Sequence, residues 1–251
     1  KTTTSSSGSY QLPPVPLGER TLVVKVSDFV VIETDIFLED ADYPFDLSIP
    51  EPFEFTDIRD GNKYDALKIG TQTWMIKNLA YLPTVSPSSI GSGSSPYYYV
   101  YGYQGSSVED AITMDYMYGD YGVLYNWEAA KTACPSGWHL PSDKEWKTLE
   151  MYCGMSPLEV DEQDNRISGN LGLKLKSTTG WNRNFIDQSS GNGDNCSGFN
   201  AFPGGARDDP SFVYRGDVAF FWSSDAWVRS LYGSDDGIFR RRGNYTNGYS
   251  V

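Results

Sequence analysis

The sequence predicts an α+β fold, in which small antiparallel sheets with long loops carry two helices. Three observations lead to this class. Only two segments show strong helix signals, and both lie within residues 126–154. After residue 172, short apolar runs alternate with Gly, Asn and Asp, as expected for strands joined by turns. The 251 residues include 25 Gly and 14 Pro, which favour many short elements over a helical bundle.

The N-terminal part of the chain divides into two predicted segments. Residues 1–20 begin with KTTTSSSGS, and this polar stretch predicts a flexible tether. Residues 21–54 form a β-rich lead-in, because TLVVKV and FVVIETDIFL are rich in β-branched residues and predict two strands. An acidic, Pro-containing linker follows these strands, and we expect one domain over residues 55–251.

The predicted domain begins with a hairpin. Turn signals at Asp60-Gly61-Asn62 and Gly70-Thr71 flank short alternating runs, so we expect strands at Tyr64–Ile69 and Gln72–Ile76. Residues 83–119 are rich in Ser, Gly and Tyr and exceed the length of an ordinary connection. This stretch therefore predicts an inserted loop region.

Two helices follow this loop region. Asn126 is placed to cap the helix WEAAKTA, which ends before Pro135. Ser142 begins the second helix, and Glu145 three residues later completes a capping box. Gly154 is placed to stop that helix.

The composition excludes several function classes. The net charge of −13 argues against nucleic-acid binding, which depends on Lys and Arg neutralising phosphates. No apolar run has the length needed to span a bilayer. His139 is the only histidine, so a His-based metal site or a Ser-His-Asp triad would rest on that one residue. These features disfavour most hydrolases.

Six stretches together resemble one known family. They are IGTQTWMIKNL (69–79), GVLYNWEAAKTACPSGWHLPSDKEW (122–146), LKLKSTTGWN (173–182), GFNAFPGGARD (198–208), FFWSSD (220–225) and GYSV (248–251). Over residues 55–251 the chain resembles the Fibrobacter succinogenes major paralogous domain. The block of helix, Cys, Gly-Trp-His-Leu-Pro and helix is also similar to the C-type lectin-like and formylglycine-generating-enzyme folds. This resemblance implies a C-type lectin-like architecture.

The resemblance also implies a location. Such domains belong to surface-exposed or secreted bacterial proteins, often lipoproteins of the Bacteroidetes type. We therefore expect the extracellular face of the outer membrane, or secretion. The Ser/Thr-rich start resembles a lipoprotein tether whose lipid-bearing Cys would precede residue 1, which would be the only membrane attachment. The alternative is that residue 1 is an arbitrary boundary.

The three cysteines depart from the family pattern. Family members continue after GYSV with Arg-Cys, so the resemblance implies a partner for Cys134 beyond Val251, without which Cys134 is free. Cys153 and Cys196 are additions to the pattern. Because two extra cysteines occur together, we expect a Cys153–Cys196 disulfide between the end of the second helix and the GDNCSG loop.

A candidate ligand site follows from aromatic residues beside polar loops. Sugar-binding sites use an exposed aromatic face with Asp, Asn and Arg side chains for the hydroxyl groups. The segments around TTGWN and WSSDAW have this composition. The candidate residues are Trp181, Asn182, Asp194, Asn195, Arg207, Asp208, Asp225 and Trp227. The alternative is that these residues fix long loops in place.

No metal or cofactor is expected from the motifs. The EF-hand spacing and the calcium motifs of lectin-like domains are absent from the sequence. DGNKYD (60–65) and NGDN (192–195) do offer oxygen ligands in loops, so a structural Ca²⁺ is the alternative.

Two further features have simple structural explanations. We expect the ring of His139 to bond to a loop carbonyl just before the second helix. Strand alternation places Arg240 and Arg242 on one face and Arg241 on the other. We expect this basic run to guard a solvated edge strand, the alternative being recognition of an acidic partner, such as the acidic lead-in of the same chain.

These observations favour a non-enzymatic binding or adhesion protein that recognises a glycan or a protein partner. One alternative is an accessory component of polysaccharide processing, and another is a structural scaffold without a ligand. A formylglycine-generating oxidase is disfavoured, because it needs reactive active-site cysteines, whereas Cys134 belongs to the fold block and Cys153 and Cys196 are additions to the family pattern.

Overall fold

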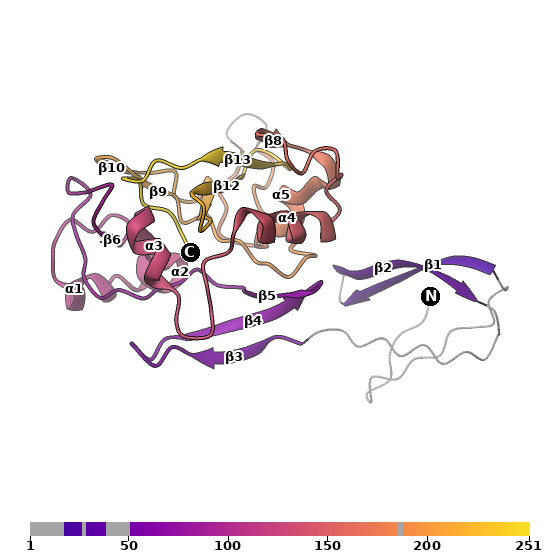
Figure 1. Cartoon of the computed structure of the whole chain (residues 1–251), viewed down its shortest axis with the longest axis horizontal. Coiled ribbons are helices and arrows are strands. Elements are labelled where there is room, and N and C mark those ends of the chain that lie inside the picture. Colours follow the sequence, from indigo (N-terminus) through magenta and orange to yellow (C-terminus); the bar gives the residue numbers. More distant parts are fainter. Residues whose placement is uncertain (1–17, 27–28, 39–50, 185–187) are drawn as a thin grey trace. The chain divides into compact units, whose positions relative to one another are not determined.

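A computed structural model describes residues 18–26, 29–38, 51–184 and 188–251 (Figure 1). The chain forms two compact units, residues 1–49 and residues 50–251. In the described residues, no helix has the length and apolar character needed to cross a membrane.

The first unit contains an antiparallel pair of strands, β1 (Gly18–Val26) and β2 (Phe29–Leu38). Their register shifts between Val24 and Lys25. The two predicted strands of the lead-in are therefore confirmed. Residues 1–17 of the predicted tether and residues 39–50 of the acidic linker lie outside the described residues.

The second unit begins with a three-stranded antiparallel sheet in the order β3-β4-β5. Its strands are β3 (Phe53–Thr56), β4 (Lys63–Ile69) and β5 (Gln72–Met75). Gly70 has a φ of 61°, a left-handed conformation that glycine adopts without a Cβ penalty, and it allows the tight turn into β5. The predicted hairpin is confirmed, and β5 lies at an edge of the sheet.

A larger antiparallel sheet has the order β11-β12-β13-β8. Its strands are β11 (Val218–Trp222), β12 (Trp227–Tyr232), β13 (Ile238–Arg242) and β8 (Asp164–Arg166). Two short ribbons accompany it: β6 (Tyr98–Tyr99) with β7 (Leu124–Tyr125), and β9 (Ala206–Asp208) with β10 (Ser211–Val213). The architecture is α+β with small antiparallel sheets, as predicted (Figure 1).

The two predicted helices are present with their predicted caps. Helix α3 (Trp127–Ala133) begins where the Asn126 side chain accepts from the Ala129 N–H. Helix α4 (Asp143–Tyr152) begins with a capping box formed by Ser142 and Glu145. Cys153, one residue before the predicted stop at Gly154, is the C-cap.

The prediction of only two helices is wrong. The described residues contain three more α-helices and a 3₁₀ turn: α1 (Val108–Ile112), α2 (Asp115–Tyr121), α5 (Leu171–Leu175) and η1 (Ser168–Asn170). These elements have three to seven residues, too few for a 3.6-residue apolar period to appear. Two of them, α1 and α2, lie in the segment expected to be a loop region.

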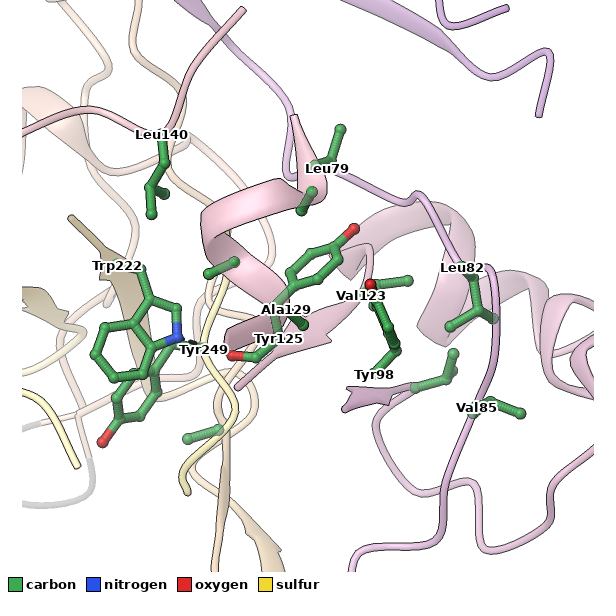
Figure 2. Packing of buried hydrophobic residues seen from close by; sticks show 14 of the residues in the cluster. Leu79, Leu82, Val85, Tyr98, Val123, Tyr125, Ala129, Leu140, Trp222 and Tyr249 are labelled. Atoms are coloured by element: carbon green, nitrogen blue, oxygen red, sulfur yellow. Dashed lines mark hydrogen bonds between the residues drawn. The ribbon is translucent and has the colours of Figure 1, made fainter. Parts of the chain in front are cut away.

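One hydrophobic core joins the β6–β7 ribbon, α3 and the C-terminal residues (Figure 2). Tyr249 packs against Trp222 with ring centroids 4.8 Å apart, and Trp222 Nε1 donates to the carbonyl of Tyr125 at 2.8 Å. The backbone N–H of Tyr125 donates to Tyr249 in turn, at 2.8 Å. The last residues of the chain are therefore part of this core.

A second core packs α4 and α5 against the larger sheet, around Trp146, Leu149 and Phe221. A buried charge network lies beside it. Glu150 accepts from Arg166 at 2.7 Å on both carboxylate oxygens, and Arg229 also donates to it. Asp143 accepts from Arg240 at 2.8 Å on both oxygens.

The basic run in β13 is not on an edge strand, because β13 lies between β12 and β8. The predicted alternation holds: Arg240 and Arg242 both lie over the ring of Trp227, whereas Arg241 pairs with Asp164. Arg240 is buried and pairs with Asp143, so the expectation of a solvated edge is wrong for this residue, whereas Arg241 and Arg242 are exposed and lie beyond the residues that pair with β8.

Candidate functional site

A pocket of about 510 Å³ opens beside β5. Five parts of the second unit line it: β5 and the residues after it, the segment from Cys134 into α4, residues 199–201, the end of β11 and Val251. This volume lies within the range of roughly 300–1,000 Å³ that is usual for small-ligand sites. The lining includes Gln72, Thr73, Trp74, Met75, Lys77, Asn78, Cys134, Trp138, His139, Glu145, Trp146, Phe199, Asn200, Ala201, Phe221 and Val251.

Strand β5 forms one wall of the pocket. Successive residues of a strand point to opposite faces, so Gln72 and Trp74 share one face while Thr73 and Met75 share the other. All four line the pocket. Residues from both faces of a strand line one cavity where that cavity runs along the edge of the strand. The pocket therefore follows the edge of β5 that does not pair with β4.

The start of α4 forms the opposite wall. The capping box fixes Glu145, whose Oε2 accepts from the N–H and the hydroxyl of Ser142 at 2.7 and 2.8 Å. Its Oε1 lies 2.8 Å from Nε2 of His139. The expectation that His139 bonds to a loop carbonyl is therefore wrong: its partner is the capping carboxylate, and its side chain is 72% exposed.

Aromatic rings make up much of the lining. Trp74 packs against Trp146 and Phe199 with centroid separations of 5.1 and 5.6 Å. Trp138, nearer the surface, stacks on Phe55 at 4.7 Å with an interplanar angle of 23°. These separations are those of favourable ring pairs, so the aromatic lining is held in place before a ligand binds.

Two buried polar atoms of this lining have no hydrogen-bond partner within the described residues. They are Oε1 of Gln72 and Nε1 of Trp74. The Gln72 amide is anchored through Nε2, which donates to the carbonyl of Glu145 at 3.2 Å. Trp74 is 9% exposed. Because a buried polar group without a partner costs roughly 1–3 kcal/mol, an acceptor at Trp74 and a donor at Gln72 would be favourable in a ligand.

The charge of the lining is balanced. Lys77 brings one positive charge and Glu145 one negative charge, and the Glu145 carboxylate is already bonded to Ser142 and His139. Although burial alone would raise the pKa of Glu145, hydrogen bonds from Ser142 and His139 lower it. Burial raises the pKa of Cys134 to about 11, so its thiol is protonated at neutral pH and is a poor nucleophile.

The two tryptophans predicted as an exposed sugar platform are buried. Trp181 is 7% exposed and its Nε1 donates to the hydroxyl of Ser177 at 3.0 Å. Trp227 is 9% exposed and lies between Arg240 and Arg242, at 3.7 and 4.1 Å from its ring centroid. Neither ring has a face free for a ligand, because Trp181 packs in the core and the guanidinium groups of Arg240 and Arg242 stack on Trp227.

The other six candidates bind different neighbours. Asn182 donates to Asp217, Asp194 accepts from the N–H of Cys196, and Asn195 accepts from the N–H of Asn200. Arg207 is fully buried and donates to the carbonyls of Ser88 and Thr246, Asp208 accepts from Asn247, and Asp225 accepts from Ser223. None of the eight candidates lines the pocket described above. Two of them bond to lining residues: Asn195 accepts from the N–H of Asn200, and Nε1 of Trp181 also donates to the carbonyl of Ala201 at 3.3 Å.

The three cysteines are free thiols in this structure. Lys174 forms hydrogen bonds beside both Cys153 and Cys196. Its Nζ donates to the carbonyl of Cys153 at 2.8 Å, and its own carbonyl accepts from the hydroxyl of Ser197, the residue after Cys196. The charge of Cys196 also contributes to the raised pKa of Cys153, after the larger effect of burial. The predicted disulfide stays a prediction. Cys134 and Val251 line the same pocket.

In the part of the chain that the structure describes, no group of three or more His, Cys, Asp or Glu side chains is placed to hold a metal ion. In DGNKYD, Asp60 accepts from the backbone and side chain of Asn62. In NGDN, Asp194 closes a turn. Asp60 and Asp194 therefore act as acceptors within their own loops.

The pocket residues were missed in the sequence because their roles depend on tertiary contacts. Gln72 and Trp74 lie in the predicted strand Gln72–Ile76, which the structure confirms as β5. The only available signal was a polar Gln on the same strand face as a Trp, two residues away. Nothing local shows that α4 and residues 199–201 leave a cavity beside that strand.

The fold and the pocket define an α+β domain with a preformed cavity at a sheet edge. A family model, the Fibrobacter succinogenes major domain, matches residues 67–251. The chain belongs to this family, which confirms the resemblance seen in the sequence. No curated protein and no solved structure matches the chain.

Proposed function

We propose that the chain is a non-enzymatic binding protein of the bacterial cell surface, whose pocket recognises a glycan or a protein partner. The observation that carries the proposal is the aromatic pocket with the unpartnered Gln72 Oε1 and Trp74 Nε1. A preformed, mostly apolar cavity with a few convergent polar groups is the usual form of a binding site. The protonated thiol of Cys134 and the engaged carboxylate of Glu145 favour binding over catalysis.

The proposal includes a C-type lectin-like arrangement of the domain and a place on the outer face of the outer membrane, or secretion. Its support is the helix, Cys, Gly-Trp-His-Leu-Pro and helix block, together with the small antiparallel sheets that the structure shows. Attachment would be through a lipid upstream of residue 1. An accessory role in polysaccharide processing and a ligand-free scaffold are the alternatives.

The test is a screen of the full chain on a glycan array and on a peptide array. The Thr73→Trp variant places a large ring on an exposed strand residue that lines the pocket, where β propensity tolerates it. Lys63→Trp is the matched control, because Lys63 is equally exposed in the same sheet but does not line the pocket. We expect Thr73→Trp to weaken any hit at least tenfold and Lys63→Trp to leave it unchanged.

Three outcomes would contradict the proposal. Both arrays could be blank, Thr73→Trp could bind as well as the unmodified chain, or the bound ligand could be recovered chemically altered. The first would favour a scaffold, the second a different site and the third an enzyme. Adding a chelator should not change binding, because the described lining holds no cluster of metal ligands.

A further inference from the structure

The register of the β4–β5 pair determines which backbone groups face the pocket. The N–H of Ile76 donates to the carbonyl of Asp65 at 3.0 Å, which marks Asp65 and Ile76 as a hydrogen-bonded pair. Such pairs alternate along an antiparallel ladder, so Trp74 and Gln72 also bond to β4. The N–H and C=O groups of Thr73 and Met75 consequently point away from β4.

These four backbone groups lie along the pocket. Thr73 and Met75 both line it, and β5 has no strand partner beyond β4 within the described sheets. No backbone or side-chain group of the described residues bonds to the N–H or C=O of either residue. An unpaired strand edge is a template for another strand.

We propose that the partner of this pocket is an extended, uncharged peptide segment that adds to β5 as a further strand and places an apolar side chain among the aromatic rings. The inference rests on the proposed function and specifies its ligand. The segment would bond to the backbone groups of Thr73 and Met75, which both line the pocket.

The spacing of the free groups favours a peptide over a sugar. Thr73 and Met75 present a donor and an acceptor each, repeated every second residue. An extended peptide carries the matching repeat, whereas the hydroxyl groups of a pyranose do not. Main-chain bonds would give the affinity, and the pocket would select the side chain.

The charges indicate a neutral segment. Lys77 and Glu145 cancel within the lining, so neither an acidic nor a basic side chain gains a net attraction there. The net charge of −13 of the chain also disfavours an acidic partner. Trp74, Trp146 and Phe199 give the interior its aromatic character.

The first test uses capped heptapeptides of the sequence Thr-Val-Thr-X-Thr-Val-Thr, with X as Phe, Leu, Thr or Asp, and measures their binding to the full chain by fluorescence anisotropy. We expect Phe and Leu at X to bind at least tenfold more tightly than Thr or Asp. The best peptide is then N-methylated on either of its two alternating sets of amides. Methylation of one set of amides should abolish binding, and methylation of the other set should leave binding unchanged, because only one set faces β5.

The second test alters the protein. Thr73→Pro removes the outward N–H without removing a bond to β4, since proline is tolerated at a strand edge whose N–H is unpaired. Thr73→Val keeps that N–H. We expect Thr73→Pro to weaken binding at least tenfold, Thr73→Val to weaken it much less, and the control Lys63→Val, in the same sheet but outside the pocket, to have no effect.

The inference would be overturned if the peptides bound equally tightly whatever the residue at X. It would also be overturned if methylation of either set of amides reduced the affinity equally. Should Thr73→Pro not fold, the methylated peptides decide the question on the unmodified chain. A glycan hit that Thr73→Trp removes, with no peptide binding, would overturn the peptide inference while the proposed function survives. If Thr73→Trp removes neither glycan binding nor peptide binding, the pocket itself is not the binding site.

Discussion

Glu150 is the residue whose loss we expect to cost most stability. Its side chain is fully buried and accepts from both Arg166 and Arg229. Glu150→Gln keeps the shape but leaves the buried Arg166 without its counter-charge and removes one of the two carboxylates that pair with Arg229. We expect the free energy of unfolding to fall by about 3–5 kcal/mol, measured by urea denaturation with an unchanged m value.

The matched control for this prediction is Glu109→Gln, an identical change on the exposed first turn of α1. It should stay within about 0.5 kcal/mol of the unmodified chain. A loss from Glu150→Gln as small as that of the control would show that the buried network does not contribute to stability.

For single residues, the sequence predicts a local role such as helix capping better than it predicts which distant residues surround a side chain. The Ser142 and Glu145 capping box follows from local spacing and is present. Trp181 and Trp227 were predicted beside exposed loops, because neighbouring residues are polar. Their burial depends on Ser177, Arg240 and Arg242, and the arginines are brought to Trp227 by pairing between strands.

The capping box makes the start of α4 both a stability element and a wall of the pocket. Ser142→Ala removes the side-chain oxygen that accepts from the N–H of Glu145. We expect a loss of about 1 kcal/mol in the free energy of unfolding, measured by thermal denaturation. Ser142→Thr should restore most of it, and Ser136→Ala, in an exposed turn, should have no effect. Equal stability of Ser142→Ala and Ser136→Ala would contradict the role of the cap.

The disulfide prediction concerns the junction of α4 with the loop around residue 196. Oxidation by oxidised glutathione would join the two thiols as it is reduced to two glutathione molecules. We expect a Cys153–Cys196 bond in protein recovered from an oxidising compartment, seen as a gain of two hydrogens on reduction. Two thiols that alkylate freely in native, unreduced protein would contradict it. Burial, which raises the pKa of Cys153 to about 12, makes the uncatalysed reaction slow.

Element type was predictable where an element is long or capped. β4, β5, α3 and α4 were all predicted, because each has a turn or cap signal and a clear apolar pattern. Helices α1, α2 and α5 have too few residues to show a period. Strand order was not predictable either: the charges of Arg240 to Arg242 suggest an edge, whereas β8 pairs on the outer side of β13.

For the molecule as a whole, we predict a loss of stability in acid. The pKa of Asp57 is lowered by its hydrogen bond to Arg59. Burial alone would raise the pKa of Asp143, but Arg240, Lys147 and Arg229 hold it well below the usual range. Carboxyl groups with a lowered folded-state pKa stabilise the fold above the unfolded pKa of about 4 and lose that effect as pH falls.

The free energy of unfolding should therefore be nearly constant from about pH 8 to pH 5 and fall steeply below about pH 4. Urea denaturation at each pH checks this. Asp143→Asn should reduce the slope below pH 4, because one of the groups responsible is absent. A flat profile down to about pH 3, or an unchanged slope in Asp143→Asn, would contradict the assignment.

The class and family of the whole domain were predictable, whereas its pocket was not. Six stretches, among them the block from Cys134 to Trp146, together resemble the family, and the family match over residues 67–251 confirms it. The pocket depends on how closely α4 and residues 199–201 approach the edge of β5, a distance that no local pattern encodes. Gln72 and Trp74 therefore gain their importance only in the folded domain.

An amide NMR titration of the full chain with the Phe-centred heptapeptide tests directly whether the pocket beside β5 binds a peptide. We expect the amide signals of Thr73 and Met75 to shift and become protected from hydrogen exchange, and the indole N–H signal of Trp74 to shift. Signals around Asn182, Asp194 and Asp225 should stay unchanged. Changes confined to those three loops, or no change at all, would contradict the claim that the pocket beside β5 is the binding site.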